Sequence, residues 1–282
     1  SMDAAKVIAA AATNDGSPKD WVGHNKYKQA PLKIYAVPTT SGTGSEGTMG
    51  AVISDPVTHE KSIVTGNALL PAAVAIDAQL LLGLPPHITA ATGMDALTHG
   101  IEAYIGTWER GSRKEDASIA IKLIFNNLST ACRDGSDLSA RNGMAMGAYY
   151  AGLAINQVNV GNVHAIAHQL GGKYGIPHGL ANSLVLPHIL EFCCAEAQAE
   201  LAELALLIGV GGEGESEAAL AQKFIQAVKD LKAEVGIPER SELIKREDFE
   251  QLANQALAEG IAYPSPRLLD KQSALTILEN IS

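Results

Sequence analysis

Two pairs of polar residues with helical spacing stand out in apolar, alanine-rich stretches of the sequence. Asp95 and His99 lie four residues apart in "GMDALTHG", and His164 and His168 lie four residues apart in "NVHAIAHQL". On a helix, residues i and i+4 leave the same face one turn apart. A carboxylate and an imidazole with this spacing can bind one divalent cation, although a single such pair is also a common surface contact of a helix.

A third segment adds His178, so four of the eight histidines fall in these stretches. Each buried imidazole needs a polar partner, so such a cluster is poorly explained as ordinary core packing. One carboxylate with three imidazoles favours Fe(II), Zn(II), Co(II) or Ni(II), whereas Mg(II) and Ca(II) prefer more oxygen ligands. We expect His164 and His178 to close a shell with Asp95 and His99. His168, one turn beyond His164, is then predicted to be a proton relay or a substrate contact.

A glycine-rich stretch, "SGTGSEGTMG", precedes these segments. Its Gly42, Gly44 and Gly47 have the G-x-G-x-x-G spacing of a dinucleotide-binding turn. That fingerprint has physical meaning between a strand and a helix whose N-terminus faces a pyrophosphate. "LKIYAV" before it predicts a strand, but "TMGAVISDP" after it, with a turn at Asp55-Pro56, predicts a second strand. The sequence therefore favours a glycine-rich hairpin loop over a standard Rossmann turn.

Composition narrows the class of protein. The chain has 282 residues, of which 46% are hydrophobic and only 5% aromatic, so the core is expected to consist largely of Ala, Leu, Ile and Val in packed helices. A net charge of -10 argues against nucleic acid as a partner. No apolar run is long enough to span a bilayer, and no basic-then-apolar leader opens the chain, which predicts a cytoplasmic protein without a membrane partner. Cys132, Cys193 and Cys194 lack metal or redox spacing and are expected to be inert thiols.

The elements that must position these residues fall into two regimes. Up to about Pro85, one helix, "DAAKVIAAAA", is followed by the strand-like runs "LKIYAV", "GAVISD", "KSIV" and "AAVAID". Beyond Pro85, Ala/Leu-rich segments with helical patterns are predicted at residues 87–105, 115–132, 140–155, 162–174, 197–209, 216–236 and 247–260. We expect an α+β, multidomain fold with an α/β part over 1–84 and a helical domain over 85–282. The α/β part looks incomplete, because the chain opens on a helix with no strand before it.

Three stretches taken together resemble the iron-containing (group III) alcohol dehydrogenase family: "PTTSGTGSE", "GMDALTHGIEAY" and "AGLAINQVNVGNVHAIAHQLGGKYGIPHGLANSLVLPH". The resemblance covers nearly the whole chain. It implies an N-terminal α/β dinucleotide-binding domain, followed by an all-helical dehydroquinate-synthase-like domain, with the active site in the cleft between them. It also implies a divalent metal, usually Fe(2+) with Zn(2+) as the alternative, held by Asp95, His99, His164 and His178.

The resemblance further implies NAD or NADP as cofactor, with His168 beside the nicotinamide and the substrate. In the family a T-T-x-G-T loop contacts the cofactor. The residues that match it are Thr39, Thr40, Thr43 and Thr48. Lys61 matches a cofactor-contacting lysine on a neighbouring strand. The loop is therefore expected to touch the dinucleotide from a hairpin.

The start of the chain departs from the family pattern. Family members carry a further N-terminal stretch of about a hundred residues, the scale of a domain, which ends in G-G-G-S-x-x-D. Asp3 matches the aspartate of that motif, whereas the glycine loop before it is missing from "SMDAAKVIA". We therefore expect the chain to lack about the first hundred residues of the family. The metal site and roughly half of the cofactor site would remain, with Asp3 among the cofactor contacts.

The implied reaction is the reversible oxidation of a primary alcohol or diol to an aldehyde with NAD(P), with the metal as Lewis acid. The implied partners are a small alcohol or aldehyde and further copies of the chain in a homo-oligomer. Three alternatives use the same fold: a glycerol dehydrogenase, a maleylacetate reductase and a dehydroquinate-synthase-like lyase. A fourth, from another class, is a non-catalytic metal-binding helical fragment without its cofactor domain. A turnover assay with cofactor and short alcohols separates the enzyme from that fragment.

Overall fold

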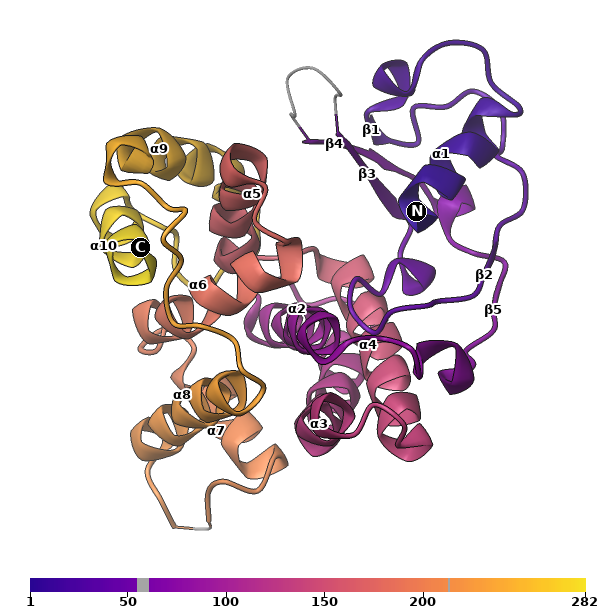
Figure 1. The fold of residues 1–282 in the computed structure, drawn as a ribbon. Helices are drawn as coiled ribbons and strands as arrows, with labels where there is room; N and C mark the ends of the chain where they lie inside the picture. Colours follow the sequence, from indigo (N-terminus) through magenta and orange to yellow (C-terminus); the bar gives the residue numbers. More distant parts are fainter. Residues whose placement is uncertain (55–60, 213) are drawn as a thin grey trace.

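The computed structural model of the chain describes residues 1–54, 61–212 and 214–282. A small part that contains the strands stands beside a larger helical part (Figure 1). The last described strand is β5 (Ala73–Val74), and the first long helix after it, α2, begins at Pro86. The change from strands to helices therefore falls close to Pro85, where the residue pattern of the sequence also changes.

The strands form two small sheets. β4 (Lys61–Thr65) lies at the centre of the first, where it pairs in parallel with β1 (Gly23–His24) and in antiparallel with β3 (Gly50–Ser54). The second sheet pairs β2 (Tyr35–Ala36) with β5 in parallel.

The prediction of a hairpin across "SGTGSEGTMG" was wrong. The strand before this loop shrinks to the two residues of β2, which lies in a different sheet from β3. The antiparallel pair is instead β3 with β4. The turn predicted at Asp55-Pro56 lies outside the described residues. β2 is only two residues long, although Ile34 O before it also accepts a hydrogen bond from the backbone N–H of Ala72, so an apolar run alone was a poor guide to the extent of a strand.

The glycines of the loop bring its backbone against α4 (Leu138–Val158). After a short 3-10 helix, Ser45–Gly47, the chain enters β3. Gly44 has a left-handed φ of 59°, and a Cβ atom on it would lie 2.6 Å from the Cα of Gly152. A Cβ on Gly152 would lie 2.3 Å from the carbonyl oxygen of Gly44. At Gly44 the absence of a side chain thus permits a helix contact that any larger residue would block.

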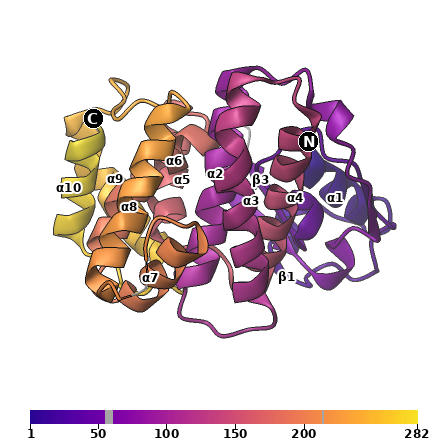
Figure 2. The same ribbon diagram turned by 90° about the horizontal axis from the view of Figure 1, so that it is seen from below.

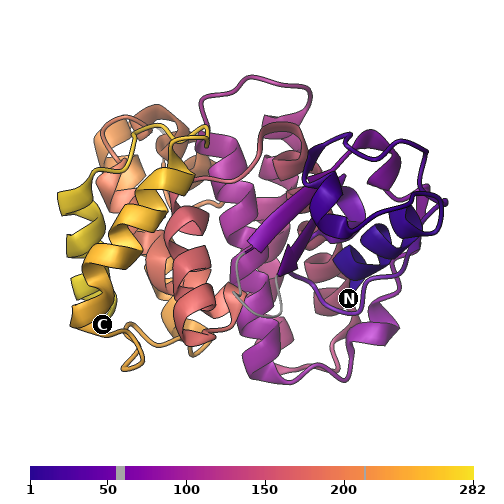
Figure 3. The ribbon, with the colours of Figure 1, turned by 90° about the horizontal axis from the view of Figure 1, so that it is seen from above.

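The first helix, α1 (Met2–Ala11), covers the larger sheet, and β3 and β4 lie between α1 and the helical part (Figure 3). Its Val7 and Ala10 pack with Trp21, Val64 and Leu69 in a small apolar cluster. A polar contact accompanies this packing. The buried Lys6 donates from Nζ to the backbone oxygens of Ser45 (2.7 Å), Thr48 (2.7 Å) and Gly50 (2.8 Å).

The helical part is built around α2, which lies between the α3–α4 pair and α6 (Figure 2). α2 (Pro86–Ile105) is buried at most positions from Thr89 onward, so it is a core helix rather than an amphipathic one. The remaining helices are α3 (Arg113–Arg133), α4, α5 (Asn162–Tyr174), α6 (His178–Phe192), α7 (Gln198–Leu207), α8 (Glu217–Glu234), α9 (Phe249–Gly260) and α10 (Lys271–Ile281). Alanine, leucine and isoleucine dominate the buried set, as the composition predicted.

Two of these helices, α6 and α10, were missed by the sequence patterns. Pro187 lies inside α6 and removes a backbone donor, which by itself argues against a helix. Burial of the segment around it overrides this cost, since α6 packs against α2, α5 and α8. α10 does carry a start signal, because the side chain of Asp270 accepts a hydrogen bond from the backbone N–H of Ser273. Among the described helices, none combines the length and the apolar character that a bilayer span requires.

Candidate active site

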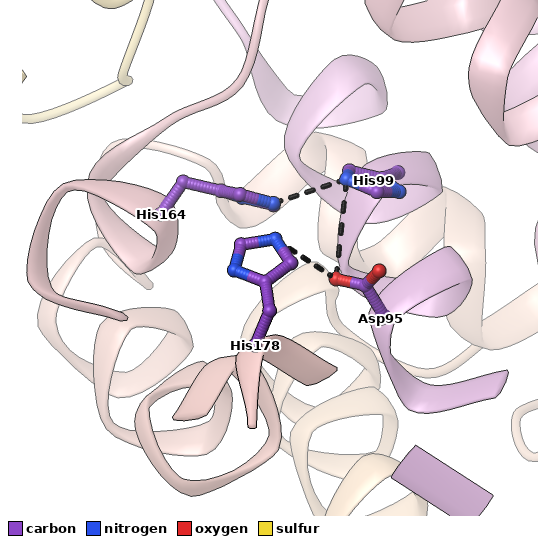
Figure 4. A group of neighbouring side chains, drawn as sticks. All are labelled: Asp95, His99, His164 and His178. Atoms are coloured by element: carbon purple, nitrogen blue, oxygen red, sulfur yellow. Dashed lines mark hydrogen bonds and ion pairs between the residues drawn. The ribbon is translucent and has the colours of Figure 1, made fainter. Parts of the chain in front are cut away.

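Four side chains from three helices point toward one another (Figure 4). Asp95 and His99 come from consecutive turns of α2, His164 from the first turn of α5, and His178 is the first residue of α6. One potential ligand atom from each lies within 4.8 Å of the others. Two short contacts join His164 Nε2 to His99 Nε2 (3.0 Å) and His178 Nε2 to Asp95 Oδ1 (3.4 Å). The structure therefore brings together the four residues that the sequence proposed as metal ligands.

The separations fit a bound divalent cation. Ligand atoms about 2.1 Å from a tetrahedral zinc or iron lie about 3.4 Å from one another. The measured separations include 3.0 Å, 3.4 Å and, from His99 Nε2 to Asp95 Oδ1, 4.0 Å. Three nitrogens and one carboxylate oxygen are also a donor set for a first-row metal.

Hydrogen bonding fixes the tautomer of His164. Its Nδ1 donates to Glu102 Oε2 at 2.6 Å, which leaves Nε2 with a lone pair that faces His99. Glu102, one turn beyond His99 on α2, is itself held by the backbone N–H groups of Gly161 (2.8 Å) and Val163 (2.7 Å) at the start of α5. A carboxylate behind a histidine is a common support of a metal ligand.

Burial favours the uncharged state of all three imidazoles. Desolvation holds the pKa of His164 well below its usual value, lowers the pKa of His99, and lowers the pKa of His178 to about 4 although Asp95 opposes this. A metal ligand must be unprotonated at the bonding nitrogen, so the histidines are in the state that ligation needs at neutral pH. Burial also raises the pKa of Glu102 to about 8, against the backbone N–H groups that stabilise its carboxylate.

Asn182, one turn after His178 on α6, contacts the same group. Its Nδ2 donates to Asp95 Oδ1 at 2.6 Å and lies 3.1 Å from His164 Nε2 and 3.3 Å from His178 Nε2. This amide restrains the Asp95 carboxylate among the imidazoles.

His168 lies next to the four residues, but its Nδ1 is turned to Glu259. Its ring stacks on that of His178 with centroids 5.3 Å apart, and its Nδ1 donates to Glu259 Oε1 at 2.5 Å. Glu259 also accepts from Tyr263 Oη (2.5 Å) and from Gln169 Nε2 (2.7 Å). Burial raises the pKa of Glu259, but the hydrogen bonds from His168, Tyr263 and Gln169 outweigh it and leave the pKa below its usual value.

The histidines form one wall of a cavity of about 490 Å³, which is within the size range of small-molecule sites. The opposite wall comes from the strand-containing part. It includes four of the residues predicted to contact a cofactor, namely Asp3, Thr43, Thr48 and Lys61. Thr39 and Thr40, also predicted, are exposed and do not line this cavity.

The cofactor-side residues are also tied to one another. Asp3 accepts hydrogen bonds from Ser45 Oγ (2.6 Å) at Oδ1 and from the backbone N–H of Val52 (2.8 Å) at Oδ2, so it joins the loop to β3. Burial lowers the pKa of Lys61, and the carboxylates of Glu259 and Asp95 oppose this. Lys61 therefore lies in the field of the site's own acidic groups.

Three residues that contact the site were missed from the sequence: Glu102, Asn182 and Glu259. Glu102 had a usable signal, since it is a charged residue inside the apolar "GIEAYI" and follows His99 by three positions on the same helix. Asn182 could not be placed without α6. Glu259 lies 91 residues from His168, and no local pattern connects the two.

Models of two protein families match the chain. The model described as "Fe-containing alcohol dehydrogenase family, C-terminal" matches residues 89–282, and the model described as "Iron-containing alcohol dehydrogenase" matches residues 1–78. Together they include the loop, β3, β4 and every helix of the site.

Curated relatives agree with these models. Alcohol dehydrogenase 4 of Saccharomyces cerevisiae (strain ATCC 204508 / S288c) is 40% identical over 281 residues, which are 98% of this chain and 72% of that protein. The 1,3-propanediol dehydrogenase of Klebsiella pneumoniae is 39% identical over 277 residues, with the same two shares. The NAD-dependent methanol dehydrogenase of Bacillus methanolicus is 37% identical over 282 residues, 99% of this chain and 74% of that protein.

Solved structures show the same fold. A 1,3-propanediol oxidoreductase superposes with a TM-score of 0.96 at 38% identity, and an alcohol dehydrogenase from Oenococcus oeni with a TM-score of 0.94 at 36% identity. Each similarity covers 100% of this chain and 74% of the other. The comparisons do not confirm two finer expectations from the sequence, that about the first hundred residues of the family are lacking and that the α/β part is incomplete.

Proposed function

The chain belongs to the iron-containing alcohol dehydrogenase family, and from this premise we propose how its site oxidises a primary alcohol or a diol to an aldehyde. One divalent cation, Fe(2+) or Zn(2+), would be held by Asp95, His99, His164 and His178. The observation that carries the proposal is that these four side chains converge, and that the three histidines among them line a cavity that Lys61 and the loop also line. The metal site and the cofactor-contacting residues thus face one space.

A bound metal and a nicotinamide would supply the chemistry, and the chain supplies their positions. A bound divalent cation is a Lewis acid that lowers the pKa of an alcohol, and the nicotinamide of NAD or NADP is the hydride acceptor. Glu102 keeps His164 in the tautomer whose Nε2 can bind a cation. His168 is the group proposed to take up the alcohol proton, because its Nδ1 is already committed to Glu259 and its Nε2 is left for the cavity.

The strand-containing part would bind the dinucleotide. Asp3, Thr43, Thr48 and Lys61 line the cavity, which supports their assignment as cofactor contacts. For Thr39 and Thr40 the assignment rests on the resemblance of the loop alone. We propose two functional parts, residues 1–84 for the cofactor and 85–282 for the metal and the substrate. The homo-oligomer and the cytoplasmic location stay predictions from the sequence.

A short alcohol or diol is the proposed substrate class. Relatives at 37–39% identity are named as dehydrogenases of methanol and of 1,3-propanediol. Apolar side chains of Ile155, Val158 and Val160 line the same cavity as the histidines. They would exclude water from the path of the hydride while leaving room for a short chain.

A metal-reconstitution assay tests the proposal. The 282-residue chain is stripped with a chelator, loaded with Fe(II) or Zn(II) under anaerobic conditions, and assayed with 1-propanol or 1,3-propanediol and NAD or NADP by the absorbance of the reduced nicotinamide. We expect turnover with metal, none after chelation, and recovery on reloading. A loaded chain that turns over no alcohol with either cofactor, and reduces no short aldehyde in reverse, would show that the proposed function is wrong.

A further inference from the structure

We propose that Glu259 is a positioning residue of the reaction, which holds His168 in the tautomer and orientation that present its Nε2 to the cavity. The inference rests on the proposed function, because it concerns the histidine assigned there to the alcohol proton. It adds a residue that neither the motif spacing nor the metal site includes. Glu259 comes from α9, a helix that supplies no side chain to the group of four.

The helices α5 and α9 pack closely where this hydrogen bond forms. Glu259 lies in the last turn of α9, and His168 lies in the middle of α5. Just beyond Glu259, a Cβ atom on Gly260 would lie 3.4 Å from the Cβ of Ala165 and 3.3 Å from Asn162 Oδ1. The backbone of α9 at Gly260 therefore lies directly against side chains of α5. The hydrogen bond from His168 Nδ1 to Glu259 Oε1 is 2.5 Å long.

The carboxylate itself is held by other donors. Tyr263 Oη donates to Oε1 at 2.5 Å and Gln169 Nε2 donates to Oε2 at 2.7 Å. With His168, three donors approach the two oxygens, so the group is in the arrangement that an ionised, acceptor-only carboxylate requires. Because both oxygens are engaged, the carboxylate cannot rotate freely, and the imidazole that donates to it is restrained as well. Among the described residues, no hydrogen-bond partner is found for His168 Nε2.

The two histidines of "HAIAH" are supported by the same device. His164 donates from Nδ1 to Glu102 at 2.6 Å, and His168 donates from Nδ1 to Glu259 at 2.5 Å. A neutral imidazole that is protonated at Nδ1 has its lone pair at Nε2. The lone pair of His164 faces His99 within the ligand group. His168 itself lines the cavity.

Glu102 and Glu259, the two carboxylates behind these histidines, differ in their exposure to solvent. The Glu102 side chain is 3% exposed, whereas the Glu259 side chain is 28% exposed. A proton taken up at His168 Nε2 makes an imidazolium whose charge Glu259 can stabilise, with solvent nearby to receive the proton. The buried Glu102 suits a histidine that keeps one state.

The first test needs no turnover. In proton NMR of the diamagnetic chain, with and without Zn(II), hydrogen-bonded imidazole N–H groups are expected at low field. One such resonance should disappear in both His168→Ala and Glu259→Ala, and should remain in Glu250→Ala, a control on α9 whose exposed carboxylate pairs with Lys271. If the resonance assigned by His168→Ala persists in Glu259→Ala, the positioning role is refuted.

The second test measures the consequence for the reaction. Glu259→Gln should lower kcat by about 10- to 100-fold, the loss typical of a group that supports a functional histidine, while KM for the alcohol and the bound metal stay unchanged. In a His168→Ala background the same substitution should have no further effect on kcat, because its action passes through that imidazole. An equal loss in both backgrounds would overturn the proposal. If the parent chain oxidises no alcohol, the proposed function fails by itself and the NMR result alone decides whether Glu259 orients His168.

Discussion

Glu102 Oε2 accepts a hydrogen bond from His164 Nδ1 at 2.6 Å across 62 positions of sequence. The same carboxylate accepts the backbone N–H groups of Gly161 and Val163, so it binds the N-terminal end of α5 as well as one of its side chains. α2 thus supplies two potential ligands, Asp95 and His99, and also the residue that orients a third. One side chain of α2 thus contacts both the start of α5 and the His164 ring.

Loss of Glu102 should therefore weaken metal binding without removing a ligand. We expect Glu102→Gln to lower the affinity for Zn(II) by about 10- to 100-fold, because an amide offers one acceptor oxygen where the two oxygens of Glu102 meet three N–H groups. Competition with a chromophoric chelator measures this. Glu115→Gln, an exposed residue at the start of α3, is the matched control. Equal affinity of the Glu102 variant and the parent would contradict the role.

The two histidines of "HAIAH" should separate binding from turnover. His164→Ala should lose both the metal and activity, because it removes one of the four proposed ligands. His168→Ala should keep the metal and the fold yet turn over about 10²–10⁴-fold more slowly, the effect typical of a general acid–base group. Elemental analysis and steady-state kinetics measure the two effects. Stoichiometric metal in His164→Ala would show that the ligand set is wrong, and parent turnover in His168→Ala would remove its proton role.

The contact of the glycine loop with α4 should be sensitive to one added carbon. In Gly152→Ala the new Cβ would meet the Gly44 carbonyl oxygen at 2.3 Å, so the loop must move. We expect a loss of about 1–3 kcal/mol in the free energy of unfolding, the usual cost of overpacking, measured by urea denaturation. Gly172→Ala, in helix α5 with nothing within 4 Å of its added Cβ, should instead be neutral or stabilising. Equal effects of the two substitutions would mean that the loop does not depend on this contact.

The buried Lys6 should stabilise the same loop through its hydrogen bonds to the loop backbone. Lys6→Met removes the ammonium group that donates hydrogen bonds to the backbone oxygens of Ser45, Thr48 and Gly50, and leaves these oxygens without that donor. We expect a cost of about 1–3 kcal/mol in the free energy of unfolding, the range for a buried polar group left unpaired. Lys33→Met, at an exposed position, is the control. A variant as stable as the parent would show that water replaces the lysine without loss.

Helical spacing predicted most of what lies near the histidines. The i, i+4 rule placed Asp95 and His99 on one face of α2 and His164 and His168 on one face of α5, and these helices are where the patterns expected them. That the four converging side chains bind a metal stays a prediction. Spacing could not supply Glu259, because its contact with His168 depends on how α5 and α9 pack, and packing between distant segments leaves no periodic trace in either.

The strand-containing part was predicted less well, for a physical reason. Strands of two residues such as β2 and β5 gain their hydrogen bonds from a partner, and their own side chains carry too little pattern to name it. The prediction of α6 failed because the local signal was clear but misleading. Pro187 argues against a helix, and the burial of the segment outweighs that cost. Sequence patterns predict a segment well where its own residues, rather than its packing partners, determine its conformation.

The burial of α2 has a consequence for directed evolution of the enzyme. Asp95, His99 and Glu102 alternate along α2 with fully buried residues such as Leu97 and Ile101. A substitution that changes the packing of this helix therefore also changes the geometry of the reaction centre. A library of variants with smaller side chains in this helix would displace the proposed metal ligands before it enlarged the cavity. Ile155, near the C-terminal end of α4, lines the cavity and is only partly buried, so substrate range is better sought there.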